Sequence, residues 1–275
     1  MRLPAPTRLV WALCAVPLCA AMAAAPLAAA TAELAGHRAI YTLTLETARG
    51  DIIGASGTMG FEVIDACDAW AVRQRLAITV TSRDGNDLDL TSDYTTWESK
   101  DGLKLRFRMR QTTEDAIVND LAGSAELERV GGPGRATYTQ PIDTTRDLPA
   151  GTMFPTAHTE AILAAARANT RFLAVPLFDG TSADGTQDST VAIATWTQPA
   201  ANTQSSAHIW PALAPLPSVR VRIAFFEREG SKQQPEYEVG MRYWENGVAD
   251  QLSMDFGDYV LSGKLTELTL PKPGC

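Results

Sequence analysis

The dominant pattern along this chain is an alternation of apolar and polar residues. A strand places successive side chains on opposite faces of a sheet, so this alternation predicts strands with one buried and one solvated face. The apolar positions that alternate most clearly are Tyr41, Leu43 and Leu45; Trp70, Val72, Leu76, Ile78 and Val80; Val219, Val221, Ile223 and Phe225; and Leu261 and Leu265. We therefore predict an all-β, mainly antiparallel fold.

Turn dipeptides separate these runs and set the register of two hairpins, because tight hairpin turns favour Asp-Gly and Asn-Gly. The dipeptides are Asp84-Gly85, Asp101-Gly102, Asp184-Gly185 and Asn246-Gly247. The pairs predicted around Asp101-Gly102 are Thr96 with Phe107, Tyr94 with Met109, Trp97 with Arg106 and Asp93 with Arg110. The pairs predicted around Asn246-Gly247 are Met241 with Leu252, Val239 with Met254 and Tyr237 with Phe256.

One segment, near residues 157–169, has the period of a helix instead. Pro155 and Thr156 open it, Ile162 and Leu163 form its apolar stripe, and Asn169 is a typical end. We expect this helix to cover or plug the sheet. Since no change of composition marks a domain boundary, we predict one strongly curved, barrel-like sheet over residues 31–275.

The N-terminus predicts export. Arg2 and Arg8 precede a short apolar stretch over residues 9–25, and small residues offer cleavage sites after Ala30 or Ala32. This layout is typical of a cleaved signal peptide over residues 1–30, after which no further stretch is long enough to span a membrane. A membrane anchor is the alternative, although it needs about 20 apolar residues.

The charge and the cysteine content limit which partners the protein can bind and in which compartment it can lie. The net charge is −8, which argues against nucleic acid as a partner because phosphate contacts need cations. Cys14 and Cys19 would leave with the signal peptide. We therefore expect Cys67 and Cys275 to form a disulfide, as an oxidising compartment allows.

Motifs of familiar catalytic chemistry are missing from the sequence. It contains no Gly-x-Ser-x-Gly elbow, phosphate loop or dinucleotide fingerprint. The three histidines, His37, His158 and His208, are scattered and form no zinc-binding pair. We expect no metal and no cofactor.

A cationic stripe is the first candidate surface. The period of a strand places Lys104, Arg106, Arg108 and Arg110 on one face, with Trp97 beside them on the preceding strand. This face could bind an anion or a protein partner. The alternative is a solvated face whose cations pair with acids on neighbouring strands, such as Asp93.

Three further features have a functional and a structural interpretation. His158 near a helix start could serve acid–base chemistry or tether the helix. The segment Leu177-Phe178-Asp179-Gly180-Thr181 could be a ligand rim or a turn. Five tryptophans outside the signal could line an interior that holds an acyl chain or pack a core: Trp70, Trp97, Trp196, Trp210 and Trp244.

Several segments together resemble the cell-envelope integrity EipB family. They are Cys67-Asp68-Ala69-Trp70, Tyr94-Thr95-Thr96-Trp97-Glu98-Ser99, Pro176-Leu177-Phe178-Asp179-Gly180, the stretch over residues 237–247 and Pro273-Gly274-Cys275. The resemblance covers about residues 37–275. It implies a periplasmic protein of Gram-negative bacteria, a spiral or broken-barrel sheet, and cysteines that match Cys67 and Cys275. The family offers no catalytic residues to carry over.

These observations lead to three functional hypotheses. The first is a non-enzymatic periplasmic protein whose curved sheet binds an apolar envelope ligand, such as a lipoprotein acyl chain or a peptide. The second is a structural adaptor that docks another periplasmic protein or peptidoglycan through the stripe Lys104 to Arg110. The third is a cell-wall hydrolase that uses His158 or a pair of carboxylates.

Overall fold

The structure is a computed structural model that describes residues 34–199, 210–228 and 234–272. By its contacts the chain divides into Met1–Ala30 and Thr31–Cys275, and all elements below belong to the second unit. The predicted signal peptide lies outside the described residues. Within the described ranges, no helix is long and apolar enough to cross a membrane.

Strands make up nearly all of the regular structure. The strands are β1 (His37–Ala48), β2 (Ile52–Asp65), β3 (Ala69–Ser82), β4 (Asp87–Ser99), β5 (Lys104–Thr113), β6 (Ala116–Leu127), β7 (Gly134–Gln140), β8 (Thr144–Leu148), β9 (Phe172–Leu177), β10 (Gln187–Ile193), β11 (Ser218–Glu227), β12 (Tyr237–Trp244), β13 (Ala249–Asp255) and β14 (Tyr259–Thr269). The helix α1 (Pro155–Arg167) separates β8 from β9. The prediction of an all-β fold with one helix is confirmed.

All the strands belong to one 14-stranded antiparallel sheet. Its order is β8-β7-β6-β5-β4-β3-β2-β1-β14-β13-β12-β11-β10-β9. The first and last strands of the chain therefore lie side by side in the middle, and two consecutive series of hairpins extend from them in opposite directions. The sheet ends at β8 and β9, the two strands that flank the helix in sequence.

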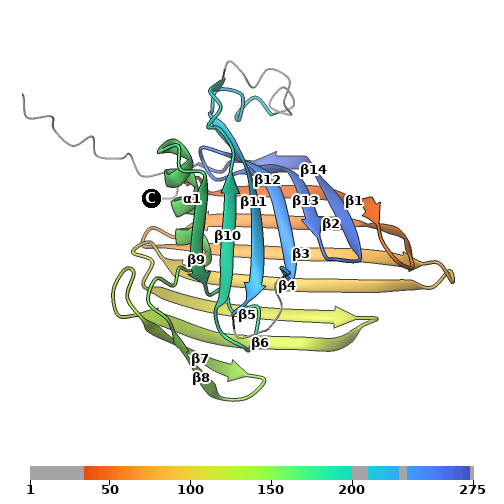
Figure 1. Cartoon of the computed structure of the whole chain (residues 1–275), viewed down its shortest axis with the longest axis horizontal. Coiled ribbons are helices and arrows are strands. Elements are labelled where there is room, and N and C mark those ends of the chain that lie inside the picture. Colours follow the sequence, from red (N-terminus) through yellow and green to blue (C-terminus); the bar gives the residue numbers. More distant parts are fainter. Residues whose placement is uncertain (1–33, 200–209, 229–233, 273–275) are drawn as a thin grey trace, which may run out of the picture. The chain divides into compact units, whose positions relative to one another are not determined.

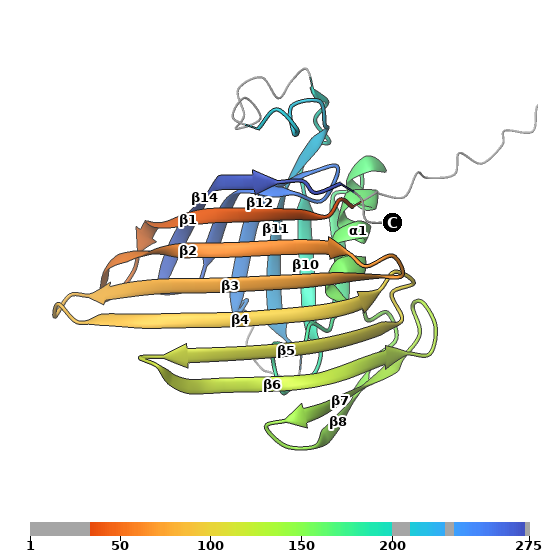
Figure 2. The same ribbon diagram turned by 180° about the vertical axis from the view of Figure 1, so that it is seen from behind.

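The two series of hairpins fold over one another. Figure 1 shows β9–β13 running across the long strands β1–β6, and Figure 2 shows the same two layers from behind. The helix covers one end of the space between the layers, as we expected. Its Ile162, Leu163 and Ala166 are buried against Val191 and Val221 from β10 and β11. Curvature thus turns the apolar face of a single sheet into two facing walls.

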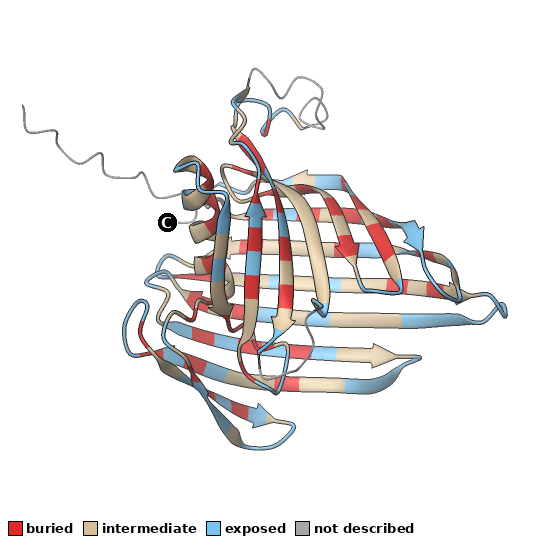
Figure 3. Ribbon diagram, viewed as in Figure 1, coloured by how far each residue is buried: buried red, intermediate tan, exposed pale blue. Residues whose placement is uncertain are grey.

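Burial follows the predicted alternation. Tyr41 and Leu43 of β1 are buried, as are Val221 and Ile223 of β11, while the residues between them are exposed. Figure 3 shows this banding along the strands. Because one face of the sheet is mostly apolar, slipping a strand by one residue would expose its apolar side chains.

The two predicted hairpins differ in outcome. Every pair predicted around Asp101-Gly102 is present, and the Arg106 guanidinium lies over the Trp97 ring at 5.2 Å. Around Asn246-Gly247, Val239 pairs with Met254 as predicted. The other two predicted pairs are wrong, because a bulge shifts the register after Gly240 and because β13 ends at Asp255, before Phe256.

Candidate functional site

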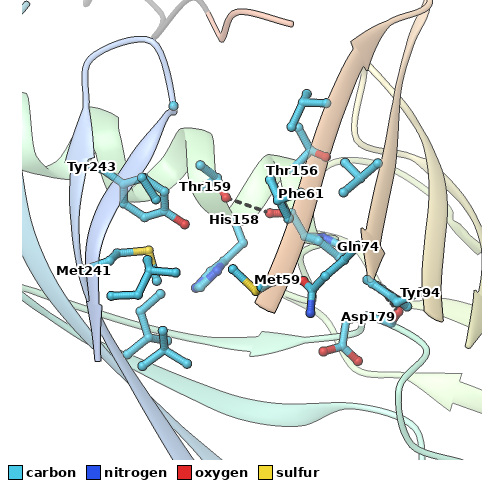
Figure 4. Close-up of a pocket in the computed structure, with 18 of the residues that line it drawn as sticks. Met59, Phe61, Gln74, Tyr94, Thr156, His158, Thr159, Asp179, Met241 and Tyr243 are labelled. Atoms are coloured by element: carbon cyan, nitrogen blue, oxygen red, sulfur yellow. Dashed lines mark hydrogen bonds between the residues drawn. The ribbon is translucent and has the colours of Figure 1, made fainter. Parts of the chain in front are cut away.

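A cavity of about 360 Å³ lies between the two walls of the curled sheet. Strands β1–β4 supply one wall, β11–β13 supply the other, and the first turn of α1 reaches into it. Figure 4 shows Met241 and Tyr243 of β12 facing Met59 and Phe61 of β2 across the space. A cavity of this size lies within the range of small-molecule binding pockets.

Apolar side chains form most of the lining. The main ones are Met59, Phe61, Leu76, Ile223, Val239 and Met241. Phe61, Leu76, Val239 and Met241 lie on the inner face of the sheet, yet they are only half-buried. In a closed core such side chains would contact each other and be fully buried. Here part of their apolar surface is left open to the cavity. Met59 and Met241, two of the lining residues, have flexible side chains that fit varied shapes.

Two neighbouring polar side chains interrupt this lining. Gln74 on β3 lies directly opposite Tyr94 on β4, and Thr96 follows on the same face of β4. Thr96 is buried, and its hydroxyl has no hydrogen-bond partner. The side-chain amide of Gln74 makes no hydrogen bond with the described residues, and it lies beside Tyr94 and Asp179 in Figure 4. The wall therefore contains an amide and a buried hydroxyl that have no partner among the described residues.

His37 adds a third such group on β1. Its Nδ1 lies 2.8 Å from the Ala35 carbonyl oxygen, which can only accept a hydrogen bond. Nδ1 must therefore carry the proton, and Nε2 is left as an acceptor without a partner. Burial lowers the pKa of His37, which keeps the ring neutral.

The loop after β9 places a carboxylate at the edge of the cavity. The Asp179 oxygens accept hydrogen bonds from the Thr181 amide at 2.9 Å, the Thr181 hydroxyl at 2.7 Å and Gln187 at 2.9 Å. The Tyr94 hydroxyl donates to the Asp179 carbonyl at 2.6 Å. Burial raises the pKa of the Asp179 carboxyl. The segment Leu177 to Thr181 is thus both a turn and part of the cavity lining, which combines the two sequence interpretations.

A second buried carboxylate fixes the helix against the sheet. Glu98 on β4 accepts hydrogen bonds from the amides of Thr156 at 2.7 Å and Ala157 at 2.8 Å, in the first turn of α1. Burial raises the pKa of Glu98 to about 7. The helix in turn brings His158 to the cavity, where its Nε2 lies 3.1 Å from the Ser189 hydroxyl. Burial lowers the pKa of His158 to about 4, so the ring is neutral.

The charge of the lining is low. No Lys or Arg side chain is among the described residues that line the cavity. The described part of the chain also contains no group of three or more His, Cys, Asp or Glu that could hold a metal ion. Apart from Asp179, the described lining residues offer apolar contact and neutral hydrogen bonding.

The predicted cationic stripe lies elsewhere, on the opposite face of β5. Lys104 lies 3.6 Å from Glu126, and Arg108 lies 3.2 Å from Asp120. Arg106 stacks on Trp97, and the exposed Arg110 lies opposite Asp93, which pairs with Arg75. Of the predicted surface residues, only His158 lines the cavity. The structure thus separates His158 from the stripe, whose role as a docking surface stays a prediction.

Cys67 and the five tryptophans are not among the residues that line the cavity. Cys67 occupies the turn between β2 and β3, where it has a left-handed φ of 69°. Cys275 lies outside the described residues, so its pairing with Cys67 stays a prediction. None of the five tryptophans lines the cavity, and Trp244 is buried in the core. The interior that we expected is therefore lined by other side chains.

Sequence reasoning missed Gln74 and Thr96 as site residues, although a signal for them exists. Gln74 falls between Val72 and Leu76 on the apolar face of a strand, and Thr96 falls opposite Phe107. A polar residue at an apolar position of an alternating strand is thus a marker of an internal site. In the sequence, His37 is only one of three scattered histidines.

Comparisons with known proteins agree with this architecture. A family profile described as EipB-like matches residues 28–272. The chain is 31% identical over 266 residues to "Cell envelope integrity protein EipB" of Brucella abortus (strain 2308), with 93% of this chain and 91% of that protein covered. It is also similar to a crystal structure described as a beta-barrel-like protein of domain of unknown function DUF1849 from Brucella abortus. That likeness has a TM-score of 0.80 and 28% identity, and it covers 88% of this chain and 100% of the other.

Proposed function

This chain belongs to the EipB-like family, and from that premise we propose that it is a non-enzymatic periplasmic protein that supports the cell envelope by binding an apolar ligand in its cavity. The name of the Brucella relative links that protein to cell-envelope integrity. The predicted signal peptide supports the periplasmic location. The ligand would be a lipoprotein acyl chain or an apolar peptide segment of the envelope.

The half-buried apolar lining is the observation that carries this proposal. Open apolar surface inside a protein is unfavourable, and each methylene group that a ligand buries there contributes roughly 0.8 kcal/mol. The alternative roles have weaker support. His158 and Asp179 already have hydrogen-bond partners in the fold, and two cations of the outer stripe already pair with acids.

The proposal is tested by filling the cavity. Leu76 points into it from β3, and Leu76→Trp adds bulk where the ligand would lie. We expect the affinity for the fluorescent apolar probe N-phenyl-1-naphthylamine to fall at least about tenfold, because the volume that buries the probe is lost. Fluorescence titration measures this change, and circular dichroism establishes that the variant is folded.

The matched control is Thr58→Trp. Thr58 lies on β2, opposite Ala77 in the sheet, and its side chain is exposed on the outer face. This variant gains the same indole ring without touching the cavity, so its affinity for the probe should stay unchanged. Equal affinities of the two folded variants would contradict the proposal.

A further inference from the structure

The polar groups inside the cavity go beyond what an apolar ligand requires. Gln74 and Thr96 lie on adjacent strands as diagonal neighbours, a relation that places such side chains about 7 Å apart. Neither side chain has a hydrogen-bond partner among the described residues, and the Thr96 hydroxyl is buried, which destabilises the folded protein. These two groups are therefore free to form hydrogen bonds with a ligand.

The character of these groups excludes an anionic head on the ligand. The amide of Gln74, the hydroxyl of Thr96 and the imidazole of His37 are all neutral. No Lys or Arg is among the described lining residues, and Asp179 would repel a carboxylate or a phosphate. An anion that entered would lose its hydration without gaining an ion pair, which is strongly unfavourable.

A cationic head is disfavoured as well. Asp179 is a carboxylate in the cavity lining, but its oxygens already accept three hydrogen bonds from Thr181 and Gln187. Glu98 directs both of its oxygens to the amides of Thr156 and Ala157. Neither carboxylate is arranged to receive an ammonium group.

An extended peptide fits the walls less well than an acyl chain does. Each residue of a peptide brings a backbone N–H and a carbonyl that need partners. The backbone groups of β1–β4 and β11–β13 are already paired within the sheet. A hydrocarbon chain needs only the apolar contact that Phe61, Leu76 and Val239 provide.

We infer that the cavity takes a single acyl chain that carries an uncharged polar group, and that Gln74 and Thr96 hydrogen-bond to this group. The amide of Gln74 both donates and accepts, and the hydroxyl of Thr96 does the same. An ester, amide or hydroxyl next to the chain therefore satisfies them. This inference rests on the proposed function and specifies the chemistry of its ligand.

Ligands that share one chain and differ in the head group test the inference. The compounds are 1-decanoylglycerol, decanamide, decanoate and decylamine, each used below its micelle-forming concentration at pH 8 to displace N-phenyl-1-naphthylamine. We expect both neutral compounds to bind at least about tenfold more tightly than either charged one. Decanoate or decylamine binding as tightly as decanamide would overturn the inference, as would tighter binding of an uncharged tetraleucine peptide capped at both ends.

Two variants test the named residues. Thr96→Val keeps the shape of the side chain and removes its hydroxyl, so we expect a higher melting temperature together with roughly fivefold weaker binding of decanamide. Gln74→Leu should weaken decanamide binding by a similar factor. Gln111→Leu, the same exchange on β5 outside the cavity lining, is the control and should leave binding unchanged.

The outcomes separate this inference from the proposed function. If no compound displaces the probe, ligand binding itself fails, and the inference fails with it. If all four compounds bind with the same affinity, the cavity binds apolar ligands but does not recognise a polar group. The same conclusion follows if Thr96→Val lowers stability and leaves the affinity for decanamide unchanged.

Discussion

At the scale of single residues, Gly180 allows the loop that carries Asp179 to approach the sheet. Its φ of 75° lies in the left-handed region, and a Cβ added there would lie 2.3 Å from the Phe107 ring. That ring packs edge-on against Tyr138 and Phe178. A side chain at position 180 would therefore push against a buried aromatic cluster.

We predict that Gly180→Ala lowers the free energy of unfolding by at least about 3 kcal/mol, because backbone strain and overpacking act together. The control is Gly131→Ala, since Gly131 also has a left-handed φ, of 70°, but no atom lies within 4 Å of an added Cβ. Strain alone should cost this control about 1–2 kcal/mol. Urea denaturation measures both values, and equal losses would show that the Phe107 contact is unimportant.

Single residues also show what can and what cannot be predicted from the sequence. Alternation predicted which side chains of β3 turn inward, including Val72 and Leu76. It could not show that Gln74, on the same face, meets a cavity, because this depends on a wall formed more than 100 residues later in the chain. The polar side chains without partners can be identified only from the structure, in which both walls of the cavity are present.

At the scale of elements, α1 depends on a residue from outside the helix. Phe154 precedes the helix and offers no side-chain cap. Glu98 takes over this role from β4, so the buried carboxylate stabilises the helix start through two amides that would otherwise lack partners. Sequence reasoning found the helix from its own residues, but a cap from another strand leaves no local signal.

This arrangement predicts a pH-dependent stability. An unfolded glutamate releases its proton near pH 4.5, whereas folded Glu98 holds it up to about pH 7. The folded state thus binds more protons between these values, so the free energy of unfolding should fall as pH rises through this window. Glu98→Gln removes this titration, so its free energy of unfolding should rise relative to that of the native protein by roughly 2.5 kcal/mol from pH 5 to pH 8.

Thermal melts of both proteins from pH 5 to pH 8 measure this difference. Glu98→Ala is the matched control: it also lacks the titration but leaves both amides without an acceptor, so its free energy of unfolding should lie about 2 kcal/mol below that of Glu98→Gln at every pH. If the curves of the native protein and Glu98→Gln run parallel over this range, the account of Glu98 is wrong.

The two hairpins show how far strand register can be predicted from the residues of a turn. The register around Asp101-Gly102 follows from its turn alone. Around Asn246-Gly247 the same reasoning fails near the turn, where Gln251 takes a left-handed φ of 52° at the bulge. No residue type there signals a bulge, so the shift could not be read from the sequence.

At the scale of the described unit, curvature creates the site. Alternation along each strand predicts an apolar face, and the sequence thereby predicts one curved sheet. The distance between the two walls depends on the twist and register of all 14 strands together, which no single pattern encodes. The walls stay apart between β1–β4 and β11–β13, and that separation leaves the apolar surface to which we assign binding.

The most direct test is native mass spectrometry of the protein purified gently from the periplasm, with Leu76→Trp prepared in the same way. We predict that the native protein carries an added mass that organic solvent extracts and that contains an acyl chain, whereas most of this mass is lost from the folded variant. A bare protein mass, or an equal load on the native protein and on Leu76→Trp, would contradict the claim that the cavity binds an apolar envelope ligand.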